Sequence, residues 1–451
     1  MLAASVPLWS QVNPAPDATA TAPVNDNSPA ADAAPLPTTA DDRMQTPPTV
    51  SGAAYPTTYT SEQRSNYVRG GLTFSTAYSD NVLVSASGTP LSDVSYLVTP
   101  SIALDQTTSR LHWVFAYSPG FTFYQRDSSA NQANQNLSSS FQYRLSPHVT
   151  LSLRDSFQKS SSVLDQPDLA SAGAVTGSAQ GVTAVVIAPL ADQLTNKGDV
   201  EITYQFNANT MIGASGTFTN LHYSNSAQVP GLFDSASQSG AAFYTRRISK
   251  KHYLGVTYQY QRILSYPIGE QSETQTHSVQ AFYTVYLQPK LSLSVAGGPQ
   301  HSDVNQSPLP SASAWTPALT ASMGWQALRT ALAASYSRIV SGGGGLLGAF
   351  HSNSASLSLR QQLSLNWNAQ VSGAYSINKT LTPLFFLSSP GGHSISGSAS
   401  IQRKLGQHMN AEAGYTRLHQ SYSDIPAIST APDTNREYVT ISYQFTRPLG
   451  R

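Results

Sequence analysis

From Tyr67 onward, apolar and polar side chains alternate with a period of two over long stretches of the chain. Successive side chains of a β-strand point to opposite faces, so this alternation predicts strands with one apolar and one polar face. The last such stretch sets Val439, Ile441, Tyr443 and Phe445 against Thr440, Ser442 and Gln444.

Eighteen segments carry this pattern, and each is 12 to 16 residues long. A strand that crosses a membrane needs about 9–11 residues when tilted, whereas strands of soluble proteins average about 5–6 residues. The lengths therefore favour membrane-spanning strands over a soluble sandwich or propeller. The predicted strands cover residues 67–78, 93–105, 110–125, 134–145, 149–160, 195–206, 210–223, 237–248, 252–264, 274–287, 290–301, 313–325, 328–340, 351–363, 365–378, 392–404, 408–420 and 434–446.

The connections between these segments alternate in length. Short turns such as 146–148, 207–209 and 250–251 follow every even-numbered strand, and longer segments such as 161–193 follow the odd-numbered ones. Membrane barrels have short periplasmic turns, longer external loops and an even number of strands. Because lipid cannot hydrogen-bond an open strand edge, the sheet must close on itself. We therefore predict an all-β fold, an antiparallel up-and-down transmembrane β-barrel of about 18 strands at residues 67–451.

Residues 1–66 differ from the rest of the chain, since they are rich in Pro, Ala and Thr and have no periodicity. Such a composition cannot bury a core, and we predict a disordered leader, either a periplasmic tether or a plain exported linker. Its first residues, MLAASVPLWSQ, are interpreted as the remnant of a signal peptide. The chain has no cysteine, which suits an exported protein. Its net charge of +1 gives no electrostatic indication of a nucleic-acid partner.

The alternation and the final strand, Tyr438 to Phe445, resemble those of Gram-negative outer-membrane β-barrel proteins of the porin-like kind. The resemblance covers residues 67–451 and implies an outer-membrane location. It also implies that Tyr443 and Phe445 belong to a C-terminal signal for the barrel-assembly machinery. In that family a Phe usually ends the chain, whereas here six residues follow Phe445.

Motifs of catalysis and of metal binding are missing from the sequence: there is no G-x-S-x-G, H-E-x-x-H, P-loop or EF-hand pattern. The ten histidines are scattered without the spacing of metal ligands. We therefore expect neither an enzyme nor a bound cofactor.

The polar parity is mostly Ser, Thr, Gln, Asn and Gly, and a barrel of this size leaves an aqueous channel. Such a lining favours a diffusion channel for small neutral polar solutes. Two alternatives stay open: an outer-membrane pore of a polysaccharide-export or secretion assembly, and a structural barrel without conductance. The few charges expected to line the pore are Arg154, Glu201, Arg360, Lys404 and Glu412.

Two further features concern the outer end of the barrel. The loop at 161–194 contains the apolar stretch 182–187 and is predicted to fold against or into the mouth and narrow the pore. The alternative is a disordered surface loop. A recurring Tyr-x-Arg near the ends of ascending strands is predicted to face lipid at the outer rim, where Arg could pair with lipopolysaccharide phosphates or reach water. These pairs are Tyr260/Arg262, Tyr336/Arg338 and Tyr415/Arg417.

Overall fold

The computed structural model describes residues 66–82, 90–161, 192–224, 233–266, 271–288, 290–306, 310–343, 347–381, 391–422 and 433–449. No helix within these ranges is both long and apolar enough to cross a membrane. The predicted leader and its signal remnant lie outside the described residues, apart from Asn66.

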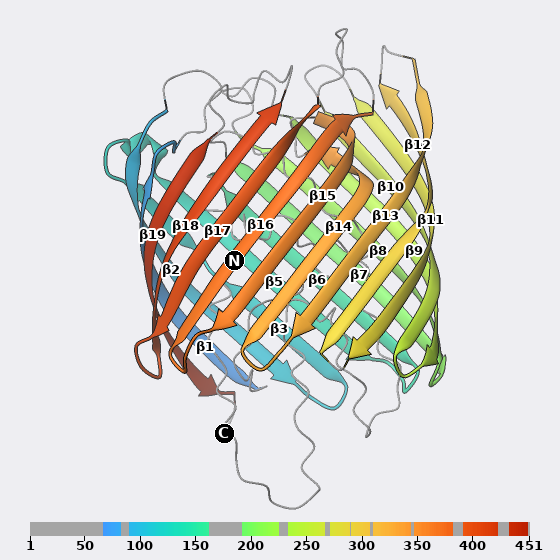
Figure 1. Cartoon of the computed structure of the whole chain (residues 1–451), viewed down its shortest axis with the longest axis horizontal. Coiled ribbons are helices and arrows are strands. Elements are labelled where there is room, and N and C mark those ends of the chain that lie inside the picture. Colours follow the sequence, from blue (N-terminus) through green and yellow to red (C-terminus); the bar gives the residue numbers. More distant parts are fainter. Residues whose placement is uncertain are drawn as a thin grey trace, which may run out of the picture.

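One antiparallel sheet forms the whole of the described structure, with its strands tilted around a common axis (Figure 1). A single short helical turn, Ser128–Ala130, accompanies it. The strands are β1 (Tyr67–Ser79), β2 (Asp93–Thr107), β3 (Leu111–Tyr117), β4 (Gly120–Tyr124), β5 (Gln132–Arg144), β6 (Val149–Ser160), β7 (Gln193–Asn207), β8 (Thr210–Tyr223), β9 (Asp234–Ser249), β10 (His252–Tyr266), β11 (Ser272–Gln288), β12 (Leu291–Gln306), β13 (Ala312–Gln326), β14 (Thr330–Gly343), β15 (Leu347–Gln362), β16 (Trp367–Thr380), β17 (Gly391–Lys404), β18 (Met409–Tyr422) and β19 (Thr434–Pro448).

The sheet closes into a barrel because its first strand pairs with its last. β1 and β19 run antiparallel from Tyr67 opposite Pro448 to Ser79 opposite Arg436. β3 and β4 both lie between β2 and β5, so the two together form one strand of the wall. The interruption between β3 and β4 lies beside Pro119, whose backbone nitrogen has no hydrogen to donate to the hydrogen bonds of the sheet. The wall is thus an 18-stranded antiparallel barrel, and this confirms the predicted fold class.

The strand boundaries differ from prediction by a few residues, mostly because the strands continue beyond the alternating core. The largest difference lies around the Gly-rich run after β14. We predicted a loop from Ser341 to Phe350, but β14 continues to Gly343 and β15 already begins at Leu347. A register shift between Gly342 and Gly343 accommodates this continuation. Glycine tolerates the backbone change that a bulge requires, so Gly342 and Gly343, whose sequence resembles a loop, are built into the end of β14.

The two faces of the wall differ as the alternation predicts. Large apolar side chains such as Leu72, Phe74 and Ile441 are exposed on the outside, where lipid surrounds the barrel. The opposite parity carries Thr73, Ser75 and many other hydroxyl and amide side chains that are buried on the inside. Among the described residues the apolar clusters are small, for example Met211, Tyr253 and Tyr286. The closed ladder of backbone hydrogen bonds therefore dominates the fold.

Candidate functional site: the lumen and its outer mouth

The inner face of the wall is lined mainly by serine, threonine, asparagine and glutamine. Serines on neighbouring strands meet in register, as in the 2.7 Å contact of Ser335 with Ser356 and the 2.6 Å contact of Ser376 with Ser394. Threonine joins them where Thr284 Oγ1 lies 2.9 Å from Ser294 Oγ. Each hydroxyl can donate one hydrogen bond and accept two, so paired hydroxyls keep capacity for a passing solute.

The five predicted pore-lining charges all fall on the inner parity of their strands. Arg154 and Glu201 come from the neighbouring strands β6 and β7, where Ser152 is opposite Glu201 and Arg154 is opposite Asp199. Glu412 on β18 accepts a hydrogen bond of 3.0 Å from the Tyr438 hydroxyl. The other two are Arg360, nearly fully buried on β15, and Lys404, partly buried at the end of β17.

Sequence reasoning missed several further charges on the inner face. Asp105 and Arg247 are buried there, and Arg247 Nε donates a 2.9 Å hydrogen bond to Asn209 Oδ1. Lys197 and Asp199 form an ion pair of 3.8 Å, and the carboxylate of Asp199 also accepts a bond of 2.6 Å from Thr217. The polar parity alone could have identified these residues. The lumen thus carries both signs of charge beside its neutral lining.

The outer ends of β14 and β15 turn away from the wall and enter the mouth. Four strands separate β10 from β15 along the wall, yet Ile263 of β10 packs with Val340 of β14 and Ala349 of β15. Gln300, from the inner face of β12, accepts a 3.3 Å hydrogen bond from the backbone N–H of Val340. The described end of this hairpin, Ile339–Gly343 with Leu347–Phe350, is called the inward tip below.

The inward tip occupies the place where a constriction was expected from another segment. The predicted constricting loop at 161–194 lies outside the described residues except for its ends, and its last residues, Gln193 and Leu194, belong to β7. The inward tip is a described segment that crosses into the outer mouth, where Val340 and Ala349 contact Ile263 of β10.

The three Tyr-x-Arg pairs have the outward parity that was predicted for them, and their arginines lie four or five residues before the ends of their strands. Their contacts differ. Arg262 forms a bidentate ion pair with Glu273, with Nε–Oε1 at 2.8 Å and Nη2–Oε2 at 3.1 Å. Arg417 lies 3.8 Å from Asp433. Arg338 has no carboxylate partner among the described residues, and its Nε is buried without a hydrogen bond.

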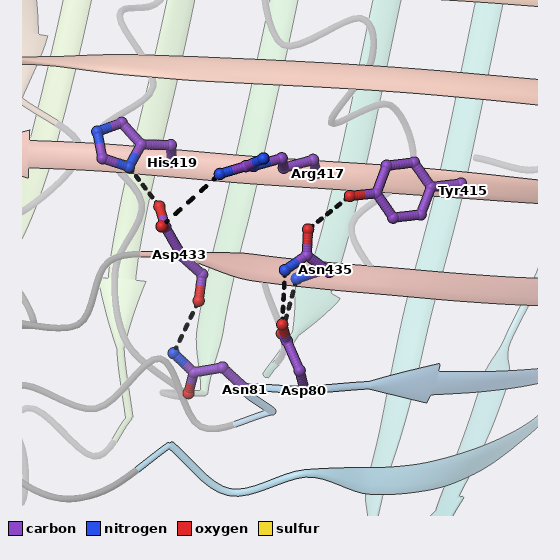
Figure 2. A network of polar contacts seen from close by, with 7 residues as sticks. All are labelled: Asp80, Asn81, Tyr415, Arg417, His419, Asp433 and Asn435. Carbon is purple, nitrogen blue, oxygen red and sulfur yellow. Dashed lines mark hydrogen bonds and ion pairs between the residues drawn. The ribbon is translucent and has the colours of Figure 1, made fainter.

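The contacts around Arg417 belong to a polar network at the outer end of the closing seam, where β18, β19 and β1 meet (Figure 2). Asp433 binds both His419 and Arg417, and its backbone oxygen accepts a 3.2 Å bond from Asn81 Nδ2. Asn435 donates to both carboxylate oxygens of Asp80, at 2.7 Å and 2.6 Å. The network therefore joins the first strand of the barrel to its last at the rim.

No protein-family model matches the chain, and no curated protein matches its sequence. Solved structures similar to it include OccK2 (OpdF) of Pseudomonas aeruginosa, at 9% identity and a TM-score of 0.43, which covers 84% of this chain and 98% of that one. OpdQ of Pseudomonas aeruginosa has 10% identity, a TM-score of 0.43 and coverages of 84% and 97%. The siderophore receptor PirA of the same species has 10% identity, a TM-score of 0.41 and coverages of 85% and 81%.

The structure of this chain itself has the features of a membrane-spanning barrel. A closed antiparallel wall leaves no strand edge for lipid over most of its circumference, and short turns gather at the end where β1 begins and β19 ends. The outer parity is apolar and the inner parity is polar, the inverse of a soluble protein. Its outer face contacts the membrane lipid, including lipopolysaccharide in the outer leaflet. The chain is accordingly a β-barrel protein of the Gram-negative outer membrane.

Proposed function

We propose that the barrel is a diffusion channel that passes small neutral polar solutes across the outer membrane. The observation that carries this proposal is the paired hydroxyl lining, represented by Ser335 with Ser356 and Ser337 with Ser354. Hydroxyl and amide groups exchange hydrogen bonds with sugars and similar solutes, whereas strongly ion-selective pores use rings of one charge. The lumenal charges Arg154, Glu201, Arg360, Lys404 and Glu412 would line the aqueous path and bind water and solute.

The test is conductance in planar bilayers, combined with swelling of vesicles that contain the full chain. We expect discrete conductance steps, and faster swelling in a neutral pentose or hexose than in a neutral trisaccharide. A chain that inserts and folds but gives neither conductance nor swelling would instead be a structural barrel. Rapid entry of large polysaccharide would favour the export or secretion pore, in which partner proteins supply the specificity.

Two interactions of the outer surface accompany this proposal. Tyr443 and Phe445 are exposed on the lipid side of β19. The barrel-assembly machinery would recognise them during insertion. The arginines of the three Tyr-x-Arg pairs would bind lipopolysaccharide phosphates at the rim through charge-assisted hydrogen bonds. Since Arg262 and Arg417 are paired with carboxylates of their own chain, Arg338 should contribute most to phosphate binding.

A further inference from the structure

Among the described strands, the wall of the barrel is open between the outer halves of β13 and β14. β13 pairs with β12 up to Ala312, but it pairs with β14 only from Leu319 to Gln326. Beyond Arg338, β14 turns into the mouth as part of the inward tip. The segment Ala312–Ala318 therefore has a neighbouring strand on one side only among the described strands. The outer end of the β12–β13 hairpin rises at the right-hand edge of the barrel in Figure 1.

Prolines of the hairpin itself disfavour the pairing that would close this part of the wall. Continued in register, the ladder would place Pro317 opposite Val340. Proline has no backbone N–H and is found in sheets at edges. Pro317 lies directly opposite Pro299 of β12, and on the far side of that strand the β11–β12 pairing skips Val279 and Gln280. Both outer flanks of the hairpin thus lose ladder bonds beside a proline.

The opening extends below the outer interface of the membrane. Trp315 and Trp325 are exposed on the lipid face of β13 and are ten positions apart in the sequence. At about 3.3 Å per residue and a tilt of about 40°, they are separated by about 25 Å along the membrane normal, which is the height of the apolar band of such barrels. Pairing stops at Leu319, four residues below Trp315, and so about 10 Å within that band.

Two cationic side chains, Arg338 and Lys379, and the imidazole of His351 lie on the β14 side of the opening. Arg338, His351 and Lys379 share the outward face of β14, β15 and β16, and the register places His351 opposite Lys379. In the described part of the chain, several buried polar atoms beside the opening have no hydrogen-bond partner: Arg338 Nε, His351 Nε2, Thr316 Oγ1 and Ser341 Oγ. All four can donate a hydrogen bond, which suits an anionic acceptor.

We propose that this opening is a lateral portal, through which a single-chain amphiphile with an anionic head passes between the outer leaflet and the lumen. A polar strand edge is tolerated within the apolar band only where it borders protein or water. In the proposed portal the unpaired edge of β13 would border water of the mouth, which meets this condition. The acyl chain would lie in lipid beside the exposed Leu319 and Tyr336, while the head contacts Arg338, His351 and Lys379. This route goes beyond the axial diffusion channel.

The absence of cysteine from the chain permits a direct test with single-cysteine variants. Ala314 lies on the inner parity of β13, beside the portal, and would be shielded from lipid by a closed wall. In the variant Ala314→Cys, a fluorophore on this residue should be quenched by bromododecyl phosphate added to vesicles. The matched control is Thr219→Cys on the inner face of β8, which is paired with strands on both sides at that residue. Its fluorophore should be quenched at least about fivefold less.

Further variants and amphiphiles test whether the portal is specific for an anionic head group. The double substitution Arg338→Gln and Lys379→Gln in the labelled chain should weaken quenching by bromododecyl phosphate about fivefold or more. The control Arg246→Gln, on the outward parity of β9 near its periplasmic end, should leave the quenching unchanged. Bromododecanol, a neutral amphiphile of the same chain length, should quench weakly, and inorganic phosphate should not compete. Equal quenching at Ala314→Cys and Thr219→Cys, equal quenching by the alcohol, or full competition by inorganic phosphate would overturn the portal. Circular dichroism verifies that every variant is a folded barrel.

Discussion

Gly298 lies on the inner parity of β12, next to the backbone of β11 at Val279. A Cβ atom at this residue would lie 1.9 Å from the backbone oxygen of Val279, an atom that cannot move without shifting the strand. We expect Gly298→Ala to destabilise the barrel by about 1–3 kcal/mol, as overpacking of a filled site does. The measurement is the midpoint of urea unfolding in lipid vesicles.

The control for this substitution is Gly373→Ala on β16, where the added Cβ would meet its nearest atom, the oxygen of Ser396, at an ordinary 3.6 Å. Its effect should stay within about 0.5 kcal/mol. Equal unfolding midpoints for the two variants would mean that the close approach of β11 and β12 relaxes without cost.

The sequence predicted which face of the wall a residue occupies, because this depends on one strand alone. It did not predict the side-chain partners that come from neighbouring strands. The alternation alone predicted that Arg262, Arg338 and Arg417 face outward. It could not predict that Glu273 pairs with Arg262, because the two carboxylate bonds depend on the register of β10 with β11. Asp433 likewise reaches Arg417 from the residue before β19, across the β18–β19 pair.

At the scale of elements, the docking of the inward tip on β10 leads to a prediction about the width of the mouth. Ile263 is buried against Val340 and Ala349. The substitution Ile263→Ser removes an aliphatic side chain whose burial contributes about 1.5–3 kcal/mol of free energy. This loss is enough to shift the docking equilibrium of the inward tip at least about tenfold. We expect a higher single-channel conductance, because the tip then spends time outside the mouth.

Leu221→Ser provides the comparison, since Leu221 is also a buried apolar residue of the inner face, near the outer end of β8. A conductance change of the same size in both variants would show that the inward tip does not set the width of the channel.

The sequence predicted the positions of all the wall strands, because period-two alternation is a property of each segment by itself. It did not predict that β14 and β15 leave the wall. That turn depends on contacts between distant strands, such as Gln300 with Val340, and on prolines whose effect appears only once Pro299 and Pro317 are in register. The Gly-rich run was expected to be a loop because of its composition, yet Gly342 and Gly343 continue β14 and pair with Ala349 and Leu347.

For the whole molecule, closure places charges of both signs around one lumen. On β6 and β7 the inner face holds Arg154, Lys197, Asp199 and Glu201, in adjacent register. Fixed charges closer together than the Debye length, about 8–10 Å at physiological salt, largely cancel in the field that a passing ion experiences. The native channel should therefore discriminate weakly between cations and anions, in keeping with a path for neutral solutes.

Two opposite substitutions test this balance. Arg154→Gln removes a cation from the inner face and should make the channel favour cations, while Glu201→Gln removes a nearby anion and should make it favour anions. The measurement is the reversal potential in a tenfold gradient of potassium chloride, expected near zero for the native chain and displaced in opposite directions by the two variants. Both displacements should shrink as the salt concentration rises, because screening shortens the reach of each charge. Variants that leave the reversal potential unchanged would show that ions pass along a part of the lumen distant from β6 and β7. A strongly displaced potential in the native chain would contradict the proposed preference for neutral solutes, because it requires an uncompensated field of one sign along the lumen.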